Sequence, residues 1–223
     1  MMTDRCRRLL CILLCAVLVF SNVQFAGAQE TGEQKAYDIY PVVRDITYDG
    51  TEFPVPARVN VVFETGIDSA TRNYLLEVLD DNGIKTKVVE SPADQGFHIL
   101  LGVNGSGEVA DRYEDTLTLN TQGLYDKYDS YVLEANENQI VIVGRDTDGT
   151  FCGVATLKMM LSSFDERVLL GARIEDYAGI EYRGFVEGFY GGWDYETRGE
   201  LMKFARDVKM NMYVYASKTD TYH

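Results

Sequence analysis

The final segment of the sequence constrains the fold most, because it contains two short apolar runs with a helical pattern between them. The first run, residues 182–186, leads into the glycine-rich Gly188-Phe-Tyr-Gly191, and the second, residues 211–216, leads into the polar Ser217-Lys-Thr-Asp220. Between the runs, Asp194 can cap the start of a helix. The order of strand, loop, helix, strand and loop predicts a β/α unit with parallel strands, whose sheet needs cover on both faces.

The helix expected after Asp194 has a regular apolar face. Its members are Leu201, Phe204, Ala205, Val208 and Met210. We expect this face to be buried in a core. A (β/α)8 barrel needs about 250 residues, far more than the segment after Ala178 provides. We therefore expect the first β/α unit or units of a truncated TIM (β/α)8 barrel over residues 171–223, and a chain that is the N-terminal fragment of a longer protein.

A small α+β domain is expected before this unit, over residues 29–170. Apolar, β-branched runs predict its strands, and apolar spacing behind capping residues predicts its helices. The expected strands are residues 59–63, 85–89, 98–103, 131–134 and 139–144, the last two forming a hairpin, and the expected helices are residues 68–82 and 151–161. A further extended segment, residues 173–178, is assigned to the second unit. The fold class is thus α/β, with a small α+β domain followed by an incomplete barrel.

The N-terminus has the pattern of a secretory signal peptide. Three arginines among residues 5–8 precede an apolar run, residues 9–20, and Ala26-Gly-Ala28 offers a cleavage site. A membrane-spanning helix needs about 20 apolar residues, so the shorter run favours a signal that is removed. We expect cleavage after residue 28, a secreted or cell-surface protein, and no stable membrane span afterwards.

The chain without its signal peptide would be strongly acidic. The whole sequence carries a net charge of -14, and residues 1–28 contribute three Arg and one Asp, or +2, so the remainder carries -14 minus +2, or -16. This charge disfavours nucleic acid as a partner. Cys152 is the cysteine that remains, and its apolar helix predicts that it is buried.

Two loops could form a binding site. In a barrel, the loops that follow the strands share one face, so Gly188-Phe-Tyr-Gly191 and Ser217-Lys-Thr-Asp220 would face the same mouth. Glycine lets a ligand approach the backbone, aromatic rings stack on apolar sugar faces, and Lys218 can donate hydrogen bonds to hydroxyl or carbonyl oxygens. This set suits an uncharged polar ligand. The alternatives are a tight turn with core aromatics and, for Lys218 and Asp220, solvated loop charges.

Other chemically active residues have plain structural readings. Glu187 is either an acid or base, or a structural partner, for example of Arg183. His98 lies in an apolar strand and is expected to be a core or edge histidine. No Ser-His-Asp spacing, H-E-x-x-H motif or Walker loop occurs, so we expect neither a metal nor another cofactor.

A resemblance to a known family sharpens these readings. Residues 182–191, 209–218 and 220–223 closely resemble the start of the catalytic barrel in glycoside hydrolase family 84, whose members typically show E-G-F-Y-G and then N-T-Y-x-Y-A-P-K-D-D-P-Y-H. This family of β-N-acetylglucosaminidases includes O-GlcNAcases and clostridial enzymes named hyaluronidases. The segment from Gly144 to Gly153 is similar to part of the small domain that precedes such barrels.

The resemblance implies roles for four residues. Gly188 matches the glycine whose main-chain carbonyl meets a sugar hydroxyl, Tyr190 the tyrosine beside the pocket, and Lys218 the lysine that hydrogen-bonds N-acetylglucosamine. Asp220 matches the second acid of the K-D-D run, which orients its surroundings. Departures from the motif, at positions that the family fills with proline, aspartate and proline, are Ser217, Thr219 and Thr221. They affect the stiffness of the loop that carries Lys218.

The resemblance also implies the reaction, a retaining hydrolysis of terminal β-linked N-acetylglucosamine from glycans or glycoproteins. The N-acetyl oxygen of the substrate attacks the anomeric carbon to give an oxazoline, an exception to the scheme with two protein carboxylates. The assisting pair of aspartates would lie beyond His223, so no catalytic residue is assigned here and the fragment is expected to be inactive. The alternatives are a family 20-like β-hexosaminidase, with an Asp-Glu pair instead, and a noncatalytic carbohydrate-binding or adhesion protein.

Overall fold

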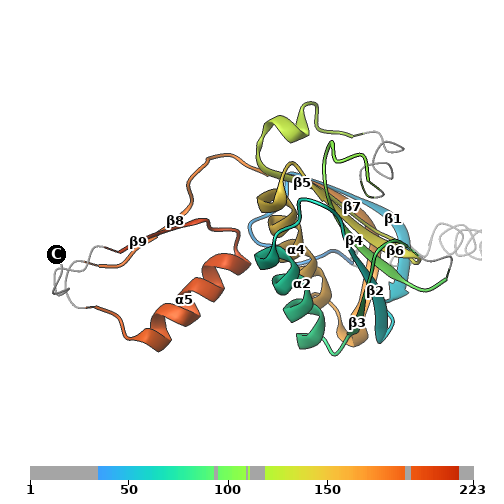
Figure 1. Cartoon of the computed structure of the whole chain (residues 1–223), viewed down its shortest axis with the longest axis horizontal. Helices are drawn as coiled ribbons and strands as arrows, with labels where there is room; N and C mark the ends of the chain where they lie inside the picture. Colours follow the sequence, from blue (N-terminus) through green and yellow to red (C-terminus); the bar gives the residue numbers. More distant parts are fainter. Residues whose placement is uncertain (1–34, 93–94, 109, 111–118, 189–191, 216–223) are drawn as a thin grey trace, which may run out of the picture. The chain divides into compact units, whose positions relative to one another are not determined.

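The computed structural model describes residues 35–92, 95–108, 110, 119–188 and 192–215 (Figure 1). The expected signal peptide, residues 1–28, lies outside these ranges and stays a prediction. Residues 37–223 cluster into one unit by their internal contacts. Within the described ranges, no helix combines the length and the hydropathy that a membrane span requires.

A seven-stranded mixed sheet forms the centre of this unit, in the order β1-β7-β5-β6-β4-β2-β3 (Figure 1). Its strands are β1 (Asp45–Pro54), β2 (Arg58–Phe63), β3 (Lys85–Val89), β4 (His98–Val103), β5 (Tyr128–Ala135), β6 (Gln139–Gly144) and β7 (Val168–Ala178). β3, β2, β4 and β6 pair in parallel, whereas β5 and β6, β5 and β7, and β1 and β7 pair antiparallel. The five strands predicted for the small domain are confirmed, including the β5–β6 hairpin.

Two helices of the small domain begin behind aspartate caps, α2 where the sequence indicates and α4 four residues before the expected start at residue 151. α2 (Ser69–Asp81) is capped by Asp68, whose carboxylate accepts a hydrogen bond from the N–H of Thr71 at 2.8 Å. α4 (Thr147–Ser162) is capped by Asp146, which accepts from the N–H of Gly149 at 3.0 Å. Such caps satisfy backbone donors that the first helical turn leaves unpaired. Two 3-10 turns, η1 (Leu124–Asp126) and η2 (Asp165–Arg167), also lie in the described part of the small domain.

The two faces of the sheet bury separate clusters of apolar side chains. Along β4, Ile99 and Leu101 belong to the larger cluster, which includes residues of α2 and α4. Leu100, between them, belongs to the smaller cluster with Leu124 of η1. This alternation follows from the period of two along a strand. A continuous apolar run such as β4 is therefore typical of a strand covered on both faces, and Figure 1 shows α2 and α4 along the same face of the sheet.

β7 differs most from the sequence expectation. It runs from Val168 to Ala178 and pairs with β1 and β5 along its length. The boundary expected between residues 170 and 171 therefore falls inside this strand, and residues 173–178 extend the seven-stranded sheet instead of joining the second unit. The strand continues through Gly171 because β1 pairs with the residues on both sides of it, Leu170 and Ala172. A Cβ on Gly171 would lie 2.1 Å from Oδ1 of Asp49, so the exposed Asp49 side chain would have to move to admit a larger residue.

The β/α unit predicted after residue 182 is present in the described residues. It consists of β8 (Gly184–Val186), α5 (Tyr195–Asp207) and β9 (Met212–Val214). β8 and β9 pair in parallel, with Phe185 opposite Tyr213. A Cβ on Gly184 would lie 1.7 Å from the carbonyl oxygen of Met212, so the close approach of the two strands requires glycine there. The structure thus contains one strand-helix-strand unit of the kind from which β/α barrels are built.

The expected burial of the apolar face of α5 is wrong for most of its length. Ala205 is buried, but Phe204 is 57% exposed and Leu201 is only partly covered. The reason is geometric, because the described strands of this unit are only three residues long. They offer too little surface to cover a helix of 13 residues.

Polar side chains connect the β/α unit to the small domain. Lys209, just after α5, donates hydrogen bonds to Asp176 at 2.8 Å and to the hydroxyl of Tyr131 at 3.0 Å. Arg183, just before β8, pairs with Asp129. Both contacts lie at the N-terminal ends of β8 and β9, so the opposite ends of these strands are left for the loops that follow them.

Candidate functional site

The candidate site begins at Gly188, the second residue after β8. Gly188 is exposed, and a Cβ added there would meet no atom of the described chain within 4 Å. No contact within the described residues therefore requires a glycine at this position. The missing side chain leaves the main chain accessible here.

Glu187, the residue before Gly188, is completely buried and binds four donors. Its carboxylate accepts hydrogen bonds from Nε and Nη2 of Arg198, each at 2.7 Å, from the N–H of Trp193 at 2.9 Å, and from the hydroxyl of Tyr213. Its own N–H donates to the carbonyl of Val214 at 2.9 Å. One side chain at the end of β8 thus contacts α5, β9 and the segment before α5.

The hydrogen bonds from Arg198 lower the pKa of Glu187 to about 2, with further contributions from Tyr213 and the N–H of Trp193. The carboxylate is therefore ionised at neutral pH and has no proton to give. Its oxygens are occupied by donors, so it is also poorly placed to accept one. Glu187 is therefore a structural partner of other residues, and not a general acid or base.

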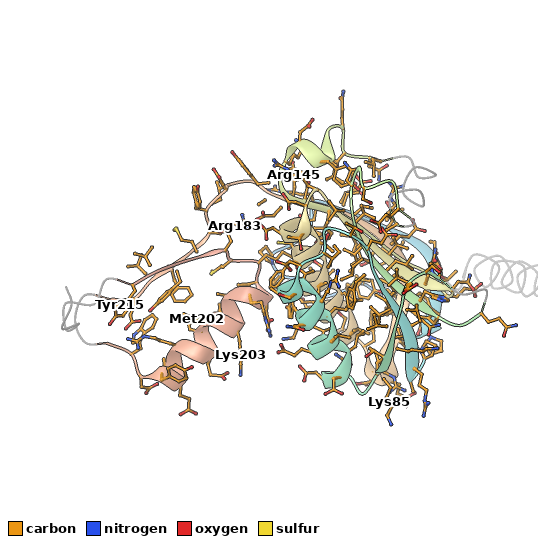
Figure 2. The ribbon with its side chains drawn as sticks, viewed as in Figure 1. Lys85, Arg145, Arg183, Met202, Lys203 and Tyr215 are labelled. Atoms are coloured by element: carbon orange, nitrogen blue, oxygen red, sulfur yellow. The ribbon has the colours of Figure 1, made fainter. Side chains whose placement is uncertain are left out.

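The partner itself is Arg198 and not Arg183, which corrects the example given from the sequence. Arg183 and Glu187 stand at opposite ends of β8, and a strand rises about 3.3 Å per residue, so the two side chains do not meet. Arg198 lies in the first turn of α5, which faces the end of β8. Figure 2 shows Arg183 and Tyr215 at opposite ends of the two-stranded sheet.

Aromatic rings pack beside the Glu187 carboxylate and its donors. Phe185 lies 5.1 Å from Tyr213 and 6.1 Å from Trp193 between ring centroids. Tyr215 lies 6.5 Å from Tyr213 and under the guanidinium of Arg198, at 5.2 Å. Phe185 and Tyr213 are partly buried, and Tyr215 is 44% exposed just after β9.

Three of the four predicted site residues lie outside the described residues. These are Tyr190, Lys218 and Asp220. Gly188 is described and stands at the C-terminal end of β8, and β9 ends at Val214, shortly before Lys218. The parallel pairing of β8 and β9 directs both following segments to the same end of the sheet.

Sequence reasoning missed Arg198 and Tyr213 as partners of Glu187. A signal for Arg198 was available, because it follows the capping residue Asp194 by four positions and so lies one turn into the helix, on the side of the cap. Tyr213 and Tyr215 share one face of β9 by their spacing of two, but nothing in the sequence shows which one reaches the carboxylate.

A second polar cluster lines a cavity of about 280 Å³ between β7 and the end of α5. Lys209, Asp176 and Tyr131 line it, and Tyr131 also contacts the hydroxyl of Thr156 at 2.5 Å. Burial raises the pKa of Tyr131 well above its ordinary value. Each of these groups already has a partner, so the cluster connects two parts of the fold and leaves no obvious group for a ligand.

The remaining candidates behave as structural residues. Cys152 is buried on α4, as predicted, and burial raises the pKa of its thiol to about 12. His98 is buried with its Nε2 atom 3.3 Å from the amide nitrogen of Asn60, which confirms a core histidine. Among the residues that the structure describes, no three His, Cys, Asp or Glu side chains are grouped to hold a metal ion.

Comparison with known families divides the chain into two matches. Residues 36–177 match the family described as Glycosyl hydrolase family 20, domain 2. Residues 183–223 match the family described as beta-N-acetylglucosaminidase. The junction between the two matches falls between β7 and β8, where the large sheet ends and the β/α unit begins.

Solved structures resemble the chain across both matches. The structure of CpGH84D is 38% identical, with a TM-score of 0.80, over 85% of this chain and 32% of its own length. That of CpGH84B is 30% identical, with a TM-score of 0.65, over 84% and 31%. A beta-N-acetylhexosaminidase from Bacteroides fragilis NCTC 9343 is 13% identical, with a TM-score of 0.58, over 79% and 32%, which is a likeness of fold alone. The chain thus spans about a third of the length of these structures.

Proposed function

Because this chain belongs to the family described as Glycosyl hydrolase family 20, domain 2, and resembles glycoside hydrolase family 84 structures along its length, we propose that it is the N-terminal part of a secreted retaining β-N-acetylglucosaminidase. The proposed reaction removes terminal β-linked N-acetylglucosamine from glycans or glycoproteins. The family 84 resemblance read from residues 182–223 is confirmed at 38% and 30% identity. Export through a signal peptide at residues 1–28 is part of the proposal.

One observation carries the proposal most directly. Gly188, at the C-terminal end of a strand in a β/α unit, lies within the segment 183–223 that matches the beta-N-acetylglucosaminidase family. In a β/α barrel the residues that contact substrate stand at this end of the strands. We therefore propose that β8, α5 and β9 begin a TIM barrel, and that Gly188, Tyr190 and Lys218 bind the sugar while Asp220 orients its neighbours.

In the proposed mechanism the substrate supplies its own nucleophile. The N-acetyl oxygen forms a bond to the anomeric carbon as the glycosidic bond breaks, and an oxazoline results that water then opens. The protein contributes orientation of the acetamide and a general acid that later acts as a base. We propose that two aspartates beyond residue 223 do this, so the 223-residue chain by itself hydrolyses nothing.

A family 20-like β-hexosaminidase is the second candidate, favoured by the match of residues 36–177. The small domain does not separate the two, because it is compatible with either barrel. The match of residues 183–223 and the two family 84 structures favour the first candidate. A noncatalytic carbohydrate-binding protein is the third, and it would keep the sugar contacts without the acids.

A substrate series tests the proposed mechanism in the longer protein. Replacing the acetamide of a chromogenic β-N-acetylglucosaminide by trifluoroacetamide withdraws electrons from the attacking oxygen. If that oxygen is the nucleophile, kcat/KM falls by more than about tenfold, which corresponds to about 1.4 kcal/mol of activation free energy. Equal rates for the two substrates would instead indicate a protein nucleophile.

A further inference from the structure

Resting on the proposed function, we propose that Glu187 is a positioning residue that holds both ends of the segment 188–193 and so places the main chain of Gly188 for the sugar. Glu187 is bonded directly to Gly188 along the chain. Its carboxylate also accepts the main-chain N–H of Trp193, at 2.9 Å. Glu187 is thus joined to Gly188 through the chain and to Trp193 through its carboxylate.

The carboxylate is held from two directions besides this segment. Arg198 of α5 donates both hydrogen bonds of a planar fork, at 2.7 Å each, and the Tyr213 hydroxyl of β9 donates another. Such a paired, charge-assisted contact fixes orientation as well as distance. The N–H of Glu187 is fixed in turn by the carbonyl of Val214. Both the main chain and the side chain at residue 187 are thus anchored.

Burial of Glu187 makes its carboxylate dependent on these donors. The side chain of Glu187 is completely buried, whereas that of Arg198 is 28% exposed. A buried carboxylate is stable only when its charge is paired and its oxygens accept hydrogen bonds. The protein therefore strongly disfavours conformations in which Glu187 loses its donors Trp193, Arg198 and Tyr213.

Another ion pair on the same helix provides a control. Arg206 of α5 also forms a two-bond contact, with Glu77 of α2 at 2.8 and 3.0 Å. There the carboxylate is 46% exposed, and none of its hydrogen bonds described in the structure involves the segment 188–193. Glu77→Gln should therefore remove a comparable ion pair without affecting Gly188.

Trp193 reports on this segment without any need for activity, because it is the only tryptophan in the chain. Its N–H is held by Glu187, and its ring lies 6.1 Å from Phe185. Its fluorescence can be measured in the 223-residue chain itself. It can also be compared directly between Glu187→Gln and Glu77→Gln.

The first experiment measures acrylamide quenching of Trp193 in the 223-residue chain. Glu187→Gln should raise the quenching constant about twofold or more, because a neutral amide places N–H groups against the donors of Arg198, and Glu77→Gln should leave it unchanged. Equal quenching of wild type and folded Glu187→Gln overturns the proposal. If Glu187→Gln does not fold, Tyr213→Phe, which removes one donor and no charge, takes its place with the same criterion.

The second experiment measures turnover of a chromogenic β-N-acetylglucosaminide by the longer protein. Glu187→Gln should raise KM, and the inhibition constant for free N-acetylglucosamine, by about tenfold with a much smaller change in kcat, since lost ground-state contacts appear in KM. Unchanged KM and inhibition constant would overturn the proposal. If the wild type itself gives no turnover, the proposed function fails, and Trp193 quenching still decides whether Glu187 holds the segment.

Discussion

The ammonium group of Lys209 lies 2.8 Å from a carboxylate oxygen of Asp176, and the two side chains are only 8% and 10% exposed. Lys209 follows α5, and Asp176 belongs to β7, so this contact joins the β/α unit to the small domain. A buried ion pair of this kind is costly to break by removing one member, because the other charge is left in the interior. The small domain is therefore an energetic support for the strands that lead to Gly188.

Lys209→Met tests this support. The variant leaves Asp176 and the Tyr131 hydroxyl buried beside an apolar side chain, so the free energy of unfolding should fall by about 3–5 kcal/mol. Urea unfolding followed by circular dichroism measures it. Lys203→Met, on α5, is the control, since the Lys203–Glu200 pair is exposed; this variant should change stability by less than about 0.5 kcal/mol. If both variants lower the free energy of unfolding by similarly small amounts, the Lys209–Asp176 pair does not stabilise the protein as described.

Two glycines in helices should respond to alanine in opposite directions. A Cβ on Gly149 of α4 would lie 2.2 Å from the carbonyl oxygen of Ser130, whereas one on Gly199 of α5 would meet nothing within 4 Å. Gly149→Ala should therefore destabilise the protein by about 1–3 kcal/mol through overpacking. Gly199→Ala should stabilise its helix by about 0.5–1 kcal/mol. Thermal unfolding of both variants checks the sign, and a stabilised Gly149→Ala would show that α4 does not pack this closely on β5.

The Asp68 cap should contribute to acid sensitivity. The hydrogen bond from the N–H of Thr71 lowers the pKa of Asp68 below its ordinary value of 3.8. The folded state therefore gains stability from this carboxylate above pH 3.8, and loses it as the pH falls through the lowered value. Asp68→Asn keeps a capping oxygen without a charge. Its free energy of unfolding should depend less on pH below 4 than that of the wild type, and parallel curves would contradict this.

The hydrogen bonds of the Glu187 carboxylate should persist to a lower pH than those of an ordinary glutamate. Arg198 lowers the pKa of Glu187 from 4.5 to about 2. The stabilising contribution is therefore complete above pH 4.5 and disappears only as the pH falls through about 2. Trp193 emission, which reports the contact, should stay constant from neutral pH to below 4.5. A transition centred near 4.5 that is absent in Glu187→Gln would mean that the carboxylate is not held as described.

Local signals in the sequence predicted most of the small domain. Asp68 precedes an apolar helical pattern and caps α2 as expected, as Asp194 does for α5, whereas the cap of α4 at Asp146 was not expected. The boundary expected at residue 171 was wrong because β1 pairs with the residues on both sides of it, Leu170 and Ala172. The partners of these residues in β1, Glu52 and Tyr48, are far away in the sequence. Contacts between distant residues decide such positions, and a single sequence does not display them.

The sequence also predicted some features of the candidate site but not others. Gly188 could be placed at a strand end from the order of elements, because consecutive parallel strands end at the same edge. The partner of Glu187 could not, since Arg183 is nearer in sequence while Arg198 is nearer in space. Only the path of the chain through α5 brings Arg198 back to the end of β8.

The most direct test of the central claim is release of chromophore from a chromogenic β-N-acetylglucosaminide, measured in parallel for the longer protein and for the 223-residue chain. A matched β-glucoside, which lacks the acetamide, serves as the control. The account predicts saturable hydrolysis of the N-acetylglucosaminide by the longer protein, loss of that activity with the β-glucoside, and no hydrolysis by the 223-residue chain. Failure of the longer protein to cleave the N-acetylglucosaminide, or turnover by the 223-residue chain, would contradict it.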